Sequence, residues 1–134
     1  SLVRLYDLDA PFVVVLIWKP GCPACRKTED ELKQYYPDWK AMGGEIFSIS
    51  SATYKDLDKA VKDAVEKDMP WIVTADPYFK ARALQKYYAV TVPRLYLLDA
   101  DKKIIASRVG PEQLDQIIRE YMAKRAVALP VRDE

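Results

Sequence analysis

The chain of 134 residues contains no histidine and only two cysteines. Without histidine it has no Ser-His-Asp or Cys-His arrangement that activates a nucleophile. Structural zinc sites usually take four ligands, mostly Cys and His, so this composition argues against a zinc site within the chain. The chemistry of the two cysteines themselves is therefore the main candidate for a function.

Long apolar runs and an excess of charge of one sign are also missing. No apolar stretch reaches the about 18 residues that a membrane-spanning helix needs, so we expect no membrane segment here. The formal net charge is +1, and the mixed signs form no basic stripe that would bind nucleic acid. The length and the 50% apolar content fit a single globular domain. Because the chain starts at Ser1 rather than methionine, we expect a processed or excised fragment.

The two cysteines, Cys22 and Cys25, follow an apolar segment directly. Residues 12–18 are apolar and largely β-branched, which is typical of a buried strand, and the polar segment after the cysteines has helical spacing. At such a junction the first sulfur lies at a helix N-terminus, where free N–H groups and the helix dipole stabilise a thiolate. The second sulfur is within reach to close a disulfide. The pattern favours a dithiol redox centre.

Two other interpretations of the cysteine pair remain open at this point. One is a purely structural disulfide, although a bridge across two residues removes little entropy from the unfolded chain. The other is a pair of buried, inert thiols. Lys19 and Arg26 lie close to the pair in sequence, and they are candidates to lower the pKa of Cys22, with solvated surface cations as the equal alternative.

Apolar strand-like segments alternate with helix-like segments along the rest of the chain. The expected strands are 2–6, 12–18, 46–49, 71–73, 94–98 and 103–107, with turns at 43–44 and 99–102. The expected helices are about 22–36, 54–69, 78–88 and 110–122, and Pro37 is expected to kink or end the first. The alternating charges of residues 55–68 are interpreted as a solvated helix face. This order predicts an α/β fold, a mixed sheet with helices on both faces, over residues 1–124, with 125–134 as a tail.

The chain resembles the thioredoxin superfamily at two places. Trp18 and the segment Cys22-Pro23-Ala24-Cys25 match the active-site motif of that superfamily, and Thr91-Val92-Pro93 before a strand matches its cis-proline segment. Within the superfamily the chain is similar to the TlpA-type thiol-disulfide oxidoreductases, an exported bacterial branch. That similarity rests on Arg26, on the Asp76-Pro77-Tyr78 segment and on the apolar strands near the C-terminal end.

The resemblance implies a thioredoxin-like fold and an enzyme that exchanges disulfides without a cofactor or a metal. Cys22 is the expected nucleophile and Cys25 the expected resolving thiol. The resemblance assigns substrate binding to Trp18, Pro23, Val92 and Pro93, although Trp18 has a simpler role in the core. Expected partners are protein or small-molecule disulfides, and the expected state is a monomer in the periplasm or cell envelope. The alternative is a binding module of a larger envelope protein, in which the Cys-x-x-Cys is vestigial.

Two departures from the superfamily pattern bear on the chemistry. Thioredoxins carry a buried carboxylate six residues before the first cysteine, where this chain has Leu16. Proton transfer at Cys25 then depends on water, another carboxylate or the substrate. The residue before the first cysteine is often aromatic, and here it is Gly21, which predicts a less shielded Cys22.

Overall fold

The computed structural model describes residues 5–51, 59, 62–64, 67, 69–75 and 91–128. Their elements are the 3-10 helix η1 (Leu5–Asp7), strand β1 (Val13–Trp18), helix α1 (Pro23–Ala41), strands β2 (Glu45–Ser50), β3 (Ile72–Ala75), β4 (Arg94–Leu98) and β5 (Ile104–Ser107), and helix α4 (Pro111–Ala128). Within the same ranges, no helix is both long enough and apolar enough to cross a bilayer.

The strands of the described ranges form one five-stranded mixed sheet in the order β3-β2-β1-β4-β5. Strand β1 pairs in parallel with β2, and β2 in parallel with β3. Strand β4 is antiparallel to both β1 and β5. All six residues of β1 are buried, because β1 is the central strand and both of its faces are covered. The predicted α/β fold with a mixed sheet is confirmed.

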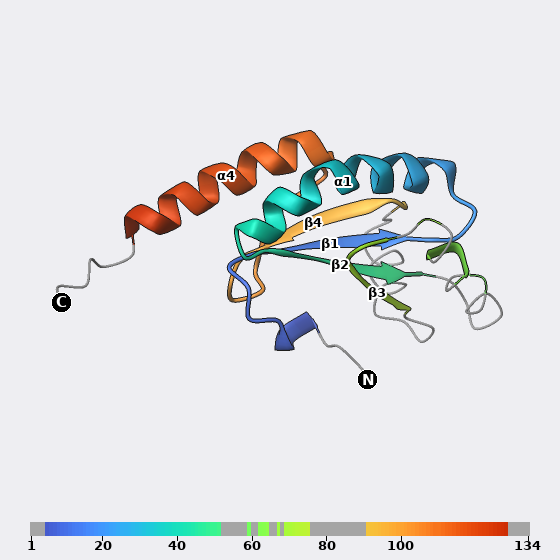
Figure 1. Ribbon diagram of the computed structural model, residues 1–134, viewed down its shortest axis with the longest axis horizontal. Helices are drawn as coiled ribbons and strands as arrows, with labels where there is room; N and C mark the ends of the chain where they lie inside the picture. Colours follow the sequence, from blue (N-terminus) through green and yellow to red (C-terminus); the bar gives the residue numbers. More distant parts are fainter. Residues whose placement is uncertain are drawn as a thin grey trace.

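Helices α1 and α4 lie together on one face of the sheet (Figure 1). Their buried side chains, such as Leu32 from α1 and Leu114 from α4, pack in one apolar cluster with Leu16 of β1. On the opposite face the other residues of β1, including Val15, pack with Leu8 from the segment after η1. Apolar clusters therefore cover both faces, although both long helices of the described ranges share one face.

The sequence predicted that Pro37 would either kink or end helix α1, and the helix does not end there but continues to Ala41. The turn after the proline carries Trp39, which is fully buried. Its indole Nε1 donates a hydrogen bond of 2.8 Å to Asp115 Oδ1 of α4. Packing of this large aromatic side chain and its hydrogen bond outweigh the backbone bond that the proline removes.

Near both ends of the described chain, the observed elements differ from the expected ones. Residues 5–7 form η1 rather than part of an edge strand, and α4 continues to Ala128, beyond the expected boundary at 124. The five other strands and the hairpin between β4 and β5 are confirmed. The expected helix 78–88, most of 54–69 and the Asp76-Pro77-Tyr78 segment lie outside the described residues.

The expected turn at Gly43 and Gly44 is present and requires both glycines. Gly43 has a φ of +93°, a conformation that side chains disfavour. A Cβ atom at Gly44 would lie 2.2 Å from the ring of Phe12, which precedes β1 and is fully buried. The turn therefore brings β2 alongside β1 in the parallel register that places both carboxyl ends at the same edge of the sheet.

Candidate active site

A disulfide joins Cys22 and Cys25 at the N-terminus of α1, with their Cα atoms 5.2 Å apart. Cys22 is the N-cap of the helix, and its Sγ accepts a hydrogen bond of 3.1 Å from the backbone N–H of Cys25. Gly21, with a φ of +72°, makes the turn after β1, and Pro23 occupies the first helical position, which proline favours. The free N–H groups of this first turn stabilise negative charge on the Cys22 sulfur when the pair is reduced.

Both cysteines are buried. Cys25 has no exposed surface and Cys22 is only 7% exposed. The less shielded Cys22 that Gly21 predicted is therefore not observed. Shielding does not require an aromatic neighbour at Gly21, because the cap geometry turns the Cys22 sulfur inward, toward the helix and the apolar cluster that contains both cysteines.

The Val92-Pro93 peptide bond is cis, as expected. Val92 packs against the apolar cluster to which Cys22 and Cys25 belong, and Arg94 at the start of β4 pairs with Ile17 of β1, so the cis-proline segment lies at the end of β1 that leads into the cysteines. Pro23 at the start of α1 is exposed. The structure therefore brings Val92, Pro93 and Pro23 to the same end of the sheet as the cysteines.

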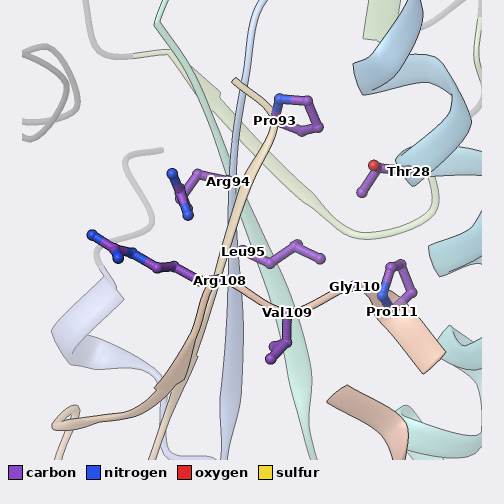
Figure 2. Close-up of a pocket in the computed structure, with 8 residues that line it drawn as sticks. All are labelled: Thr28, Pro93, Arg94, Leu95, Arg108, Val109, Gly110 and Pro111. Carbon is purple, nitrogen blue, oxygen red and sulfur yellow. The ribbon is translucent and has the colours of Figure 1, made fainter. Parts of the chain in front are cut away.

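A pocket of about 290 Å³ lies next to Pro93. Figure 2 shows Thr28 of α1 and Leu95 of β4 on one side of the β4 strand, whereas the side chains of Arg94 and Arg108 leave toward the other side. The lining residues are Thr28, Pro93, Arg94, Leu95, Arg108, Val109, Gly110 and Pro111. Because Thr28 follows Cys25 by three residues, the pocket begins within one helical turn of Cys25.

Trp18 is fully buried, and Trp71 is nearly so. Both side chains belong to the apolar cluster that contains the cysteines. Of the two roles expected for Trp18, burial supports packing beneath the disulfide and contradicts direct contact of its ring with a substrate in this oxidised form.

The sequence did not indicate a largely buried group of charges, which we call the Glu29 cluster: Glu29, Asp63 and Lys67. Lys67 Nζ lies 2.7 Å from Glu29 Oε2 and 3.2 Å from Asp63 Oδ2. Glu29 has no exposed surface, and the side chains of Lys67 and Asp63 are 12% and 9% exposed. The ammonium of Lys67 also lies 5.9 Å from the centre of the Trp18 ring. The expectation that all charges of residues 55–68 are solvated is therefore wrong for Asp63 and Lys67.

Burial raises the pKa of Glu29 above its usual value, because the ionised carboxylate loses its hydration. The hydrogen bond and the positive charge of Lys67 partly oppose this shift, whereas the negative charges of Asp63 and Asp30 add to it. One spacing in the sequence was a signal for this group: Glu29 follows Cys25 by four residues, the interval that places two residues on one helix face.

The cations near the disulfide are arranged differently from the expectation. Arg26 Nη2 lies 3.7 Å from Asp63 Oδ1, so its partner is a carboxylate of the Glu29 cluster, and Lys19 is exposed. Lys59 is the cation nearest to Gly21 in the described ranges, since its Nζ would lie 3.8 Å from a Cβ atom at that position. An ammonium group thus lies beside the turn that leads into Cys22.

A mixed five-stranded sheet, a Cys-x-x-Cys disulfide at a helix N-terminus and a cis-proline segment beside it define a thioredoxin-like domain. Thiol-disulfide exchange is the reaction of such a site, and the chain is a thiol-disulfide oxidoreductase domain. The chain belongs to the AhpC/TSA family, because the sequence profile of that family matches residues 1–107.

Individual relatives agree with this class. The thiol-disulfide oxidoreductase ResA of Bacillus thuringiensis is 28% identical over 123 residues, which are 91% of this chain and 68% of that protein. The sporulation thiol-disulfide oxidoreductase A of Bacillus subtilis is 18% identical over 105 residues, 78% of this chain and 62% of that protein. The thioredoxin domain of a thiol-disulfide oxidoreductase from Bacteroides vulgatus superposes with a TM-score of 0.74 at 25% identity, covering 90% of this chain and 85% of that one.

Proposed function

We propose that Cys22 attacks substrate disulfides and that Cys25 resolves the resulting mixed disulfide. The thiolate of Cys22 displaces one substrate sulfur as a thiolate and forms the mixed disulfide. Cys25, as a thiolate, then attacks the Cys22 sulfur, which closes the Cys22–Cys25 disulfide and releases the second substrate thiolate. The observation that carries this assignment is the position of Cys22 as N-cap, with the Cys25 N–H donated to its sulfur.

Substrate docking is proposed for the cis-proline side of the disulfide. An extended substrate segment would pair with the backbone at Val92, with Pro93 and Pro23 bordering it. The pocket beyond Pro93 supports this proposal, because it has room for one substrate side chain close to Thr28. The substrate-facing role that the resemblance assigned to Trp18 is replaced by packing, since its ring is buried.

The wider setting is also a proposal. The similarity to the exported TlpA-type branch supports a place in the periplasm or cell envelope, where disulfides persist. We propose a monomer acting on protein or small-molecule disulfides, with the catalytic domain extending to the end of α4 at Ala128, and with no nucleic-acid partner.

Catalytic turnover tests this function. With dithiothreitol as reductant, the domain is expected to accelerate the reduction of insulin disulfides, measured by the turbidity of the released chains. A variant with both Cys22→Ala and Cys25→Ala should return the rate to that of dithiothreitol alone, because no sulfur remains to form the mixed disulfide. Equal rates with the domain and with the double variant would contradict the proposal and favour a binding module with a vestigial motif.

A further inference from the structure

Resolution of the mixed disulfide needs a base that is not apparent in the apolar core around Cys25. The thiol must lose its proton before it attacks, yet Cys25 has no exposed surface. Leu16, on the strand that leads to the motif, is apolar and fully buried. The sulfur of Cys25 is thus poorly accessible to hydroxide from bulk solvent in the oxidised form.

Glu29 is the carboxylate best placed for this task. It follows Cys25 by four residues within α1, so the two side chains share one face of the helix. Side chains of a helix lean toward its N-terminus, which directs Glu29 back over the turn that contains Cys25. Glu29 is itself fully buried, so it shares the solvent-excluded surroundings of the thiol.

The hydrogen bonding of Glu29 leaves one oxygen available. Oε2 accepts a hydrogen bond of 2.7 Å from Lys67 Nζ. Oε1 is buried and has no hydrogen-bond partner in the part of the chain that the structure describes. A buried carboxylate oxygen without a donor is costly. In the oxidised protein Cys25 carries no S–H, whereas the reduced protein has a donor one turn away.

We propose that Glu29 is the proton acceptor for Cys25. In the mixed disulfide, Glu29 takes the proton of the Cys25 thiol and becomes neutral, and the Cys25 thiolate attacks the Cys22 sulfur. The Cys22–Cys25 bond forms, the bond from Cys22 to the substrate sulfur breaks, and the substrate leaves as a thiolate. Two electrons pass from the dithiol to the substrate disulfide over the cycle. This role rests on the proposed assignment of resolution to Cys25.

The neighbours of Glu29 support a reversible exchange of that proton. The hydrogen bond and positive charge of Lys67 favour the charged form of the carboxylate, which a base requires, and its side chain is 12% exposed, which links the cluster to solvent. Asp63 and Asp30 add negative charge, and Arg26 pairs with Asp63. Because the pKa of Glu29 is raised, it differs less from that of a thiol. Transfer of the proton from Cys25 to Glu29 is therefore less unfavourable.

The test separates the two chemical steps with dithiobis(nitrobenzoate) added to the reduced domain at less than one equivalent. Attack by Cys22 releases the first coloured nitrothiobenzoate, and resolution by Cys25 releases the second. In stopped-flow absorbance, Glu29→Gln should slow the second phase by about 10²-fold near pH 7 and leave the first phase unchanged. Its second phase should then rise about tenfold per pH unit toward the free-thiol pKa of about 8.5, whereas that of the wild type flattens well below it.

Matched variants distinguish proton transfer from a structural effect. Glu31→Gln makes the same chemical change two residues further along α1, where the side chain does not share the face of Cys25, and should leave both phases unchanged. Glu29→Asp retains a carboxylate and should restore part of the second phase. A Glu29→Gln variant with the wild-type rate and pH profile, or one that slows both phases equally, would overturn the proposal.

Two further outcomes are also decisive. If Glu29→Gln does not fold, the wild-type profile alone decides, since a second phase that climbs without a plateau up to about pH 8.5 would overturn the proposal. If the wild type releases only one nitrothiobenzoate and forms no disulfide, the assignment of resolution to Cys25 fails, and the role of Glu29 fails with it. If both nitrothiobenzoates are released and Glu29→Gln has no effect, the role of Glu29 fails while the assignment of resolution to Cys25 stands.

Discussion

Cys22→Ser is expected to abolish disulfide exchange, whereas Cys25→Ser is expected to trap substrates as stable mixed disulfides. A hydroxyl at position 22 does not form a bond to a substrate sulfur, so the rate should fall to that of the uncatalysed reaction. A hydroxyl at position 25 leaves the attack by Cys22 intact but removes resolution. Non-reducing gel electrophoresis after incubation with a disulfide-containing protein should show a reductant-sensitive adduct with Cys25→Ser only.

The N-cap geometry explains why the two serine variants differ. Only the Cys22 sulfur accepts the helix N-terminal N–H of Cys25, so only this sulfur gains from the charge of the first turn. The double variant Cys22→Ser with Cys25→Ser is the matched control and should form no adduct. An adduct with Cys22→Ser instead of Cys25→Ser would reverse the two roles.

Trp39→Ala is expected to lower the free energy of unfolding by about 3–5 kcal/mol. Trp39 is fully buried between α1 and the sheet, and its hydrogen bond to Asp115 joins the last turns of α1 to α4. The large loss follows from the cavity that the substitution leaves. Urea denaturation of the oxidised protein, followed by circular dichroism, measures the change.

Two controls accompany this prediction. Trp39→Phe keeps most of the apolar contact and loses the hydrogen bond, so a smaller loss of about 1–3 kcal/mol is expected. Asp38→Asn removes an exposed ion pair with Arg119 on the same two helices and should cost less than about 1 kcal/mol. If Trp39→Ala costs no more than Asp38→Asn, then burial of Trp39 does not hold α1 and α4 together.

Features that depend on residues close together in the sequence could be predicted from the sequence. The run of residues 13–18 is continuously apolar because β1 is central in the sheet, and continuous runs are typical of such strands. The spacing of Cys22 and Cys25 after this strand predicted the disulfide at a helix N-terminus. The cis bond at Pro93 could be expected only from the resemblance to a family, because spacing alone does not distinguish it from an ordinary trans proline.

Features that depend on tertiary contacts could not be predicted in this way. Pro37 breaks an isolated helix, but here the helix continues because a partner 76 residues away along the chain holds Trp39. Lys67 belongs to a segment with alternating charges, which usually indicates a solvated helix face. Its side chain is only 12% exposed because it pairs with the buried Glu29, and that pairing spans 38 residues of sequence. Local patterns carry no information about such pairings.

Counting free thiols before and after oxidation tests the central claim of a reversible dithiol centre most directly. The reduced domain, alkylated after denaturation, should bind two iodoacetamide-derived groups per chain, one for each cysteine in the sequence, as determined by mass spectrometry. After incubation with excess oxidised glutathione it should bind none, and peptide mapping should find Cys22 joined to Cys25. Two free thiols that persist, or glutathione adducts on both cysteines without an internal disulfide, would contradict the account.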